Sequence, residues 1–235
     1  MATIYLIRHG QASFGSDNYD CLSELGRHQA RLTGEYLART GVRFDAAYAG
    51  TLERQRDTAS LALAAQSEAP SIRVDSRLDE VRNDEQLEHL LPEVLESRPD
   101  LRAIVDQGLN SSKRFQKAIE AVFNYWVSPE CSHPEIQSWE EYSSNVHSML
   151  RDIMTEQGGG KTVGVFTSGG TIAVLVAAVL GLPGSATYQL YEPMFNCSVT
   201  QLFYSAERVS LSSFNDCSFL RQLSVERDEK LVTYR

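Results

Sequence analysis

An arginine and a histidine follow directly after a short apolar run near the start of the chain, in the segment Leu6-Ile7-Arg8-His9-Gly10. The apolar run is typical of a buried strand, so Arg8 and His9 are expected at its C-terminal end, where open α/β sheets bind their ligands. An imidazole is a competent nucleophile toward phosphorus, and a guanidinium group suits phosphate oxygens. These two side chains therefore suggest transfer of a phosphoryl group to His9.

A second arginine stands at the start of a predicted helix. Thr51 is expected to cap this helix, which runs to about residue 66, so that Arg54 lies in its first turn. The N-terminal end of a helix favours anions. Arg8 and Arg54 are therefore expected to hold one phosphate group from two sides.

Two further segments carry groups that suit phosphoryl transfer. The segment Arg77-Leu78-Asp79-Glu80 ends the third predicted strand, and a carboxyl group there, under a covering segment, would have a raised pKa and could donate a proton to a leaving oxygen. The segment Thr167-Ser168-Gly169-Gly170 turns a strand into a helix, where outward backbone N–H groups and small residues let a phosphate approach.

The elements that must position these groups alternate along the chain. Strands are predicted at 3–7, 44–48, 72 to about 78, 162–166, 199–204 and 209–214, and helices at 23–40, 51–66, 138–157 and 171–181. This alternation predicts a three-layer α/β/α sandwich with a mostly parallel central sheet. Residues 82–134 are polar, helix-rich and broken by prolines. They are expected to form a helical cap insertion over the active site, within a single domain that covers residues 1–235.

The charge, the cysteine spacing and the hydrophobicity of the chain limit the partners, metal sites and cellular location that we expect. The chain has 235 residues, 31 acidic and 22 basic side chains and a net charge of -9, which argues against nucleic acid as a partner but permits a small phosphorylated ligand. The four cysteines show no CxxC pairing, so no metal site and no disulfide framework are expected. No signal peptide or bilayer-spanning segment is recognisable, which favours a cytoplasmic protein without membrane contact. No cofactor is expected, and a homodimer is possible.

In their order along the chain, these segments resemble the histidine phosphatase superfamily, in its phosphoglycerate-mutase-like branch. The matching motifs are Arg8-His9-Gly10, Leu22-Ser23-Glu24-Leu25-Gly26 with Gln29-Ala30, Thr51-Leu52-Glu53-Arg54 with Thr58-Ala59, Leu78-Asp79-Glu80, and residues 165–183. The resemblance implies that His9 is the nucleophile, that Arg8 and Arg54 bind the phosphoryl oxygens, and that Glu80 is the general acid and then the base. Ser168, Gly169, Ser13 and Gln11 are counted with the two arginines among the expected phosphate-binding residues.

The chain departs from the family pattern at several positions near the phosphate. Ser168 stands where the family usually has a second histidine, and a neutral hydroxyl is a weaker donor than an ionised group. Loss of one transition-state donor typically costs about 10²–10³ in rate. Ala12 and Gly15 stand where a small hydroxyl residue and an asparagine are frequent. The candidates for compensation are Ser13, Ser16 and Asn18, together with His89 or His133, either of which could fold over the site from the insertion.

The function that follows is hydrolysis of a small phosphorylated metabolite through a phosphohistidine on His9, without a metal. Two alternatives stay open. One is a mutase that moves phosphate between hydroxyl groups of one sugar acid. The other is a catalytically impaired, phosphate-binding relative, for which the replacement of the second histidine by Ser168 is the main argument.

Overall fold

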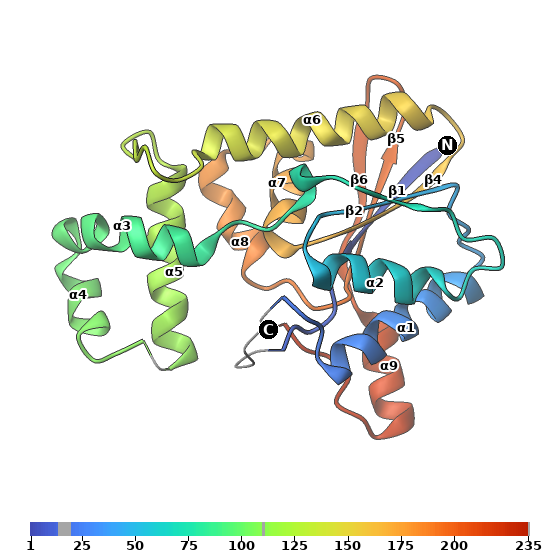
Figure 1. Ribbon diagram of the computed structural model, residues 1–235, viewed down its shortest axis with the longest axis horizontal. Helices are drawn as coiled ribbons and strands as arrows, with labels where there is room; N and C mark the ends of the chain where they lie inside the picture. Colours follow the sequence, from blue (N-terminus) through green and yellow to red (C-terminus); the bar gives the residue numbers. More distant parts are fainter. Residues whose placement is uncertain (14–19, 110, 235) are drawn as a thin grey trace.

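The fold is built on a sheet whose central strands are the predicted apolar runs. The computed structural model describes residues 1–13, 20–109 and 111–234, and within these residues six strands form one sheet in the order β3-β2-β4-β1-β5-β6 (Figure 1). The strands are β1 (Ala2–Arg8), β2 (Ala46–Ala49), β3 (Ile72–Val74), β4 (Thr162–Thr167), β5 (Val199–Tyr204) and β6 (Val209–Asp216).

The sheet is mixed but mostly parallel, as predicted. Strands β3, β2, β4 and β1 run parallel, whereas β5 is antiparallel to β1 and β6 is antiparallel to β5. In the β1–β4 pair Arg8 lies opposite Thr167. The residues that follow these two strands, His9 and Ser168, therefore emerge side by side at the C-terminal edge of the parallel strands.

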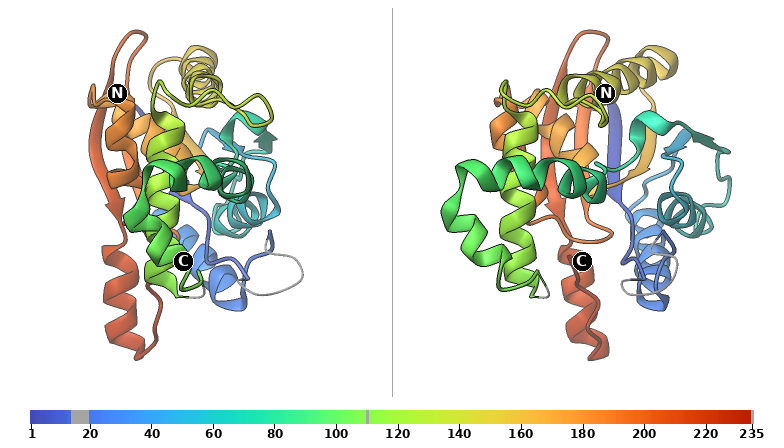
Figure 2. Two further views of the ribbon diagram at one scale, coloured as in Figure 1. Left: turned by 90° about the vertical axis from the view of Figure 1, so that its left-hand side faces the viewer. Right: turned by 60° about the vertical axis from the view of Figure 1, so that its left-hand side comes forward.

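Side chains on β1 alternate between the two faces of the sheet, and each face is covered by helices (Figure 2). Ile4 and Leu6 belong to the core shared with α6 (Trp139–Gln157) and α7 (Gly169–Val179). Ile7 belongs to the opposite core, with α1 (Glu24–Arg39), α2 (Glu53–Leu63) and α9 (Ser218–Arg227). The three-layer architecture predicted from the sequence is therefore confirmed.

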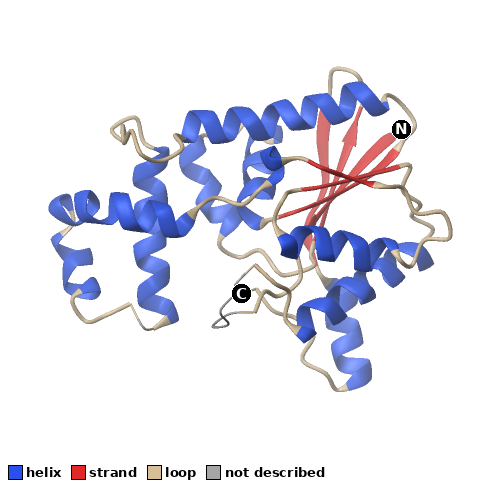
Figure 3. Cartoon of the chain, viewed as in Figure 1, coloured by secondary structure: helices blue, strands red, loops and turns tan. Residues whose placement is uncertain are grey.

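The polar region after the third strand forms helices that project to one side of the sheet, at the left of the molecule in Figure 3. They are α3 (Asn83–Ser97), α4 (Pro99–Val105) and α5 (Ser112–Val127), and α8 (Thr187–Tyr191) lies next to α5. An aromatic cluster joins α5 to α6 and α8. Within it the ring of Phe123 lies 6.0 Å from that of Trp139 and 5.5 Å from that of Tyr188.

The predicted cap of α2 is wrong. Leu52 is the N-cap residue and makes no side-chain hydrogen bond, whereas Thr51 donates from its hydroxyl group to Asp79. The Asp20 carboxylate accepts the Glu53 N–H at 2.8 Å and so caps the helix from a distant loop. The third strand also ends early, at Val74, because a 3₁₀ turn occupies Ser76–Leu78.

No element was predicted for the segments that form α8 and α9. Helix α9 buries Phe219, Leu220 and Leu223 in the core that it shares with α1. Along the described residues, every helix is too short or too polar to pass through a lipid bilayer.

Candidate active site

His9 is buried at the C-terminal edge of the sheet, with only 4% of its surface exposed. Its Nδ1 atom lies 2.7 Å from the Gly10 carbonyl oxygen, and Arg54 Nε donates to Nε2 at 3.3 Å. These contacts assign the ring proton to Nδ1 and leave the lone pair on Nε2. Burial, with the charges of Arg8 and Arg54, lowers the pKa of His9 well below 6.5, so the ring is neutral at neutral pH.

The turn after His9 is held by close backbone contacts. A Cβ atom on Gly10 would lie 2.4 Å from the carbonyl oxygen of Gly26 in α1, so only glycine fits here. The Gly10 N–H donates to the Thr58 hydroxyl at 3.1 Å, and that hydroxyl donates to the Arg54 carbonyl at 2.7 Å. The motif residues of α1 and α2 thereby fix the carbonyl that orients the His9 ring.

The charges of the two predicted phosphate-binding arginines both lower the pKa of His9, and each guanidinium group also has partners elsewhere. The Arg8 guanidinium donates to the carbonyl oxygen of Met194, and to that of Tyr234 at 3.0 Å. The Arg54 side chain pairs with the Asp20 carboxylate at 2.8 Å. Asp20 was not predicted, because no local pattern indicates that its side chain reaches Arg54, 34 positions later in the chain.

Glu80 lies close to the same two arginines. Its Oε1 atom accepts backbone N–H groups from Val81 at 3.0 Å and from Gly170 at 2.9 Å. Burial raises the pKa of Glu80 above 4.5, and this effect outweighs the opposite influence of Arg54 and Arg8. A buried carboxyl group with a raised pKa is suited to donate a proton.

Ser168 is fully buried at the N-terminus of α7. Its Oγ atom accepts a hydrogen bond from the Gln55 side-chain amide at 2.8 Å, and the same amide donates to the Leu78 carbonyl at 3.0 Å. A Cβ atom on Gly169 would lie 3.0 Å from the Tyr191 ring and 3.5 Å from Arg8 Nε. The turn between β4 and α7 thus lies against Arg8, and phosphate binding by Ser168 and Gly169 stays a prediction. Sequence reasoning missed Gln55.

The remaining predicted phosphate-binding residues lie in the loop after Gly10. The Gln11 side-chain oxygen accepts from the Ser23 hydroxyl at 2.9 Å, and the Ser13 N–H donates to the Cys21 carbonyl at 2.8 Å. These contacts tie the loop to the start of α1, and phosphate binding by Gln11 and Ser13 stays a prediction. Gly15, Ser16 and Asn18 lie outside the described residues.

His89 and His133 contact each other instead of replacing the second histidine. Their ring centroids are 5.1 Å apart. His89 Nδ1 also lies 3.5 Å from Glu135, and His133 Nε2 lies 4.0 Å from Glu93. The contacts of both rings therefore join α3 to the loop between α5 and α6.

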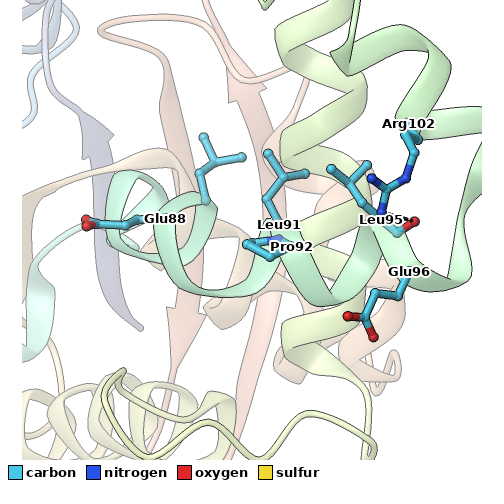
Figure 4. Close-up of a pocket in the computed structure, with 7 residues that line it drawn as sticks. Glu88, Leu91, Pro92, Leu95, Glu96 and Arg102 are labelled. Carbon is cyan, nitrogen blue, oxygen red and sulfur yellow. Dashed lines mark hydrogen bonds between the residues drawn. The ribbon is translucent and has the colours of Figure 1, made fainter.

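A surface hollow on the helical region is separate from these residues. It is lined on α3 by Leu91 and Leu95 among others, and Arg102 reaches it from α4 (Figure 4). None of the predicted site residues lines it. The hollow therefore offers no alternative location for the chemistry suggested by His9.

Comparison with known proteins matches most of the chain to one family model. Residues 4–112 and 105–217 match the model described as histidine phosphatase superfamily (branch 1). A curated 2,3-bisphosphoglycerate-dependent phosphoglycerate mutase of Bartonella henselae is 40% identical over 63 residues. That match covers 24% of this chain and only 31% of the mutase.

Solved structures share the fold at low sequence identity. A phosphoserine phosphatase mutant from Entamoeba histolytica, in complex with phosphoserine, aligns with a TM-score of 0.62 and 17% identity, over 94% of this chain and 100% of that chain. A mycobacterial glucosyl-3-phosphoglycerate phosphatase aligns with a TM-score of 0.60 and 24% identity, over 91% and 98% of the two chains.

Proposed function

The chain belongs to the histidine phosphatase superfamily, and we propose that it hydrolyses a small phosphorylated metabolite in the cytoplasm through a phosphohistidine on His9. One observation carries the proposal. The Nε2 lone pair of a neutral, buried His9 faces the Arg54 guanidinium, and Glu80, an acid with a raised pKa, lies close to the same arginine. A nucleophile, a phosphate-binding cation and a proton donor are thereby gathered at one edge of the sheet.

In the first step, His9 Nε2 attacks phosphorus and the ester P–O bond breaks. Arg8 and Arg54 bind the phosphoryl oxygens as charge builds up on them. Glu80 gives its proton to the leaving oxygen, so the alcohol departs neutral and Glu80 becomes a carboxylate. The Gly10 carbonyl stabilises the Nδ1–H of the ring, which becomes cationic when Nε2 carries the phosphoryl group.

In the second step, the Glu80 carboxylate takes a proton from water as the water oxygen attacks phosphorus. The P–N bond breaks, inorganic phosphate leaves, and His9 Nε2 recovers its lone pair. Glu80 ends the cycle protonated, as it began.

Ser168 supplies the donor that the family usually takes from a second histidine. The Gln55 amide occupies a lone pair of Ser168 Oγ, so the hydroxyl proton is left to point toward the phosphoryl group. This places a neutral donor at the N-terminus of α7, where the helix itself favours an anion.

The direct test replaces His9 by alanine. Wild-type protein should release phosphate from an aryl phosphate, and quenching with detergent at alkaline pH should trap a phosphorylated chain whose phosphate is stable in alkali and lost in acid, as in a phosphoramidate. His9→Ala should abolish both signals. His28→Ala is the matched control, because His28 is a surface residue that pairs with Glu229. Equal hydrolysis by wild type and His9→Ala would overturn the mechanism.

A mutase remains the second candidate, because the curated relative that matches over 63 residues is a phosphoglycerate mutase. Incubation with a phosphoglycerate distinguishes the two activities directly. Release of inorganic phosphate supports the phosphatase, whereas interconversion of phosphoglycerate isomers without phosphate release supports the mutase.

A further inference from the structure

Two histidines and a carboxylate gather outside the candidate active site. His89 lies on α3, and His133 and Glu135 lie on the loop between α5 and α6, which passes beside α3 in Figure 1. One potential ligand atom from each residue lies within 4.8 Å of the other two. One of these contacts joins His89 Nδ1 to a Glu135 oxygen at 3.5 Å.

Neither histidine is committed to a strong hydrogen bond. The Glu135 N–H reaches His133 Nδ1 at 3.4 Å, and His133 Nε2 lies 4.0 Å from Glu93. Both separations are long for hydrogen bonds to nitrogen. The side chains of His89 and His133 are only 28% and 18% exposed, so packing already restricts both rings. A metal ion would therefore compete with weak contacts and not with a formed network.

The donor set indicates which ion would bind. Two imidazole nitrogens and one carboxylate suit Zn²⁺, which takes such ligands at about 2.0–2.2 Å in tetrahedral sites, whereas Mg²⁺ and Ca²⁺ prefer oxygen ligands. Glu93, one helical turn after His89, adds a further negative charge beside the cluster. Water completes the coordination in sites that have three protein ligands.

We propose that His89, His133 and Glu135 form a zinc site that fastens α3 to the loop between α5 and α6. The site holds the helical region beside the catalytic residues, because α3 begins three residues after Glu80 and its first residue, Asn83, donates to the Tyr191 hydroxyl at 2.8 Å. The expectation of no metal rested on the spacing of the cysteines, and none of these three ligands is a cysteine. The proposal is independent of the phosphatase activity.

Metal binding to the full chain, freed of metal by a chelator, tests the proposal. Calorimetric titration with ZnCl₂ should show one ion per chain in wild type, and Zn²⁺ should raise its Tm. Co²⁺ at the same site should give the visible absorption of a tetrahedral complex. His89→Ala and His133→Ala should each abolish the one-to-one binding and the rise in Tm. Glu135→Gln, at a side chain that is 70% exposed, should weaken binding without disturbing the fold.

Two control variants separate this site from other histidines. His9→Ala removes the buried active-site imidazole, and His28→Ala removes a histidine that pairs with a single carboxylate. Both should bind Zn²⁺ as wild type does. Absence of one-to-one binding in wild type, or its persistence in His89→Ala and His133→Ala, would show that the cluster consists only of contacts between histidine and glutamate side chains and would overturn the proposal.

Discussion

Burial sets the protonation of His9 and Glu80, on which the proposed chemistry depends, and the charges of Arg8 and Arg54 modify it. Burial and the charges of Arg8 and Arg54 favour neutral His9, whereas burial favours protonated Glu80 despite the same charges. The pKa values of the nucleophile and of the acid are thus shifted in opposite directions, downward for His9 and upward for Glu80. One environment prepares both groups for the first step.

These opposite shifts predict the pH dependence of hydrolysis. Activity should fall in acid, because His9 gains a proton there and loses its nucleophilic lone pair. This decline should lie below pH 6.5, because the pKa of His9 is lowered from 6.5. Activity should also fall as the pH rises through the pKa of Glu80, which is raised above 4.5, because the carboxylate has no proton to donate. Profiles of kcat/KM against pH, measured with an alkyl phosphate, check both limbs.

Glu80→Gln should remove the limb that arises from ionisation of Glu80. It should slow hydrolysis of an alkyl phosphate by about 10²–10⁴, the usual contribution of a positioned acid. A nitrophenyl phosphate, whose leaving group needs little protonation, should suffer much less. Equal losses with the two substrates would show that Glu80 acts in some way other than as the general acid.

Substitutions of Ser168 distinguish an active enzyme from a catalytically impaired relative. If its hydroxyl donates to the phosphoryl group, Ser168→Ala should lower kcat by about 10²–10³, as loss of one such donor does. Gln55→Leu should also lower kcat, because the hydroxyl then loses the contact that orients it. Ser168→His should give no gain, since this position is fully buried. A large gain in Ser168→His would instead identify a disabled active site.

At the scale of the elements, Asp20 does two tasks at the start of α2. One carboxylate oxygen accepts the Glu53 N–H, and the other pairs with Arg54. The cap therefore comes from the loop before α1 and not from the residue that precedes the helix. This links the position of Arg54 to the loop that follows His9.

Asp20→Ala should lower the free energy of unfolding by about 1–2 kcal/mol, since the helix loses its cap and the arginine its partner. Asp20→Asn should retain most of the stability, because the amide oxygen can still accept the N–H. Asp57→Ala is the matched control: Asp57 pairs with Arg27 at 2.9 Å with similar exposure, so only the ion pair is lost, at less than about 1 kcal/mol. Urea denaturation measures all three, and equal losses in Asp20→Ala and Asp57→Ala would exclude the capping role.

Most strands and helices could be predicted, because the sequence patterns that indicate them lie within a few consecutive residues. The contacts that were missed join residues far apart in the chain. The apolar run of β1 and the Ser23 cap, which accepts the Gly26 N–H at 3.0 Å, are visible within a few residues. Arg54 was expected in the first turn of α2 on the strength of Thr51, yet Asp20 provides the cap. Gln55 and Ser168 are 113 positions apart, and no spacing rule connects them.

At the scale of the whole molecule, one aromatic cluster joins the helical region to the sandwich. Phe123 of α5 is buried at its centre, and its ring lies 5.6 Å from that of Trp126 and 5.9 Å from that of Tyr191. The composition of residues 82–134 predicted helices but not how they would dock, because docking depends on residues of α6 and α8 that come later in the chain. The cluster contains both tryptophans of the protein.

The cluster predicts how the molecule unfolds. Tryptophan fluorescence reports on it, whereas far-ultraviolet circular dichroism reports on all helices and strands, and the two transitions of the wild type should coincide. Phe123→Ala should cost about 3–5 kcal/mol and should separate them, with fluorescence changing first, because the loss is confined to the docking of α5. Phe219→Ala, which removes a ring stacked at 4.3 Å on Tyr36 across the opposite face, should lower stability while the two transitions stay together. Coincident transitions in Phe123→Ala would contradict this prediction. They would mean that the helical region and the sandwich still unfold as one unit without this ring, because other contacts hold the two together.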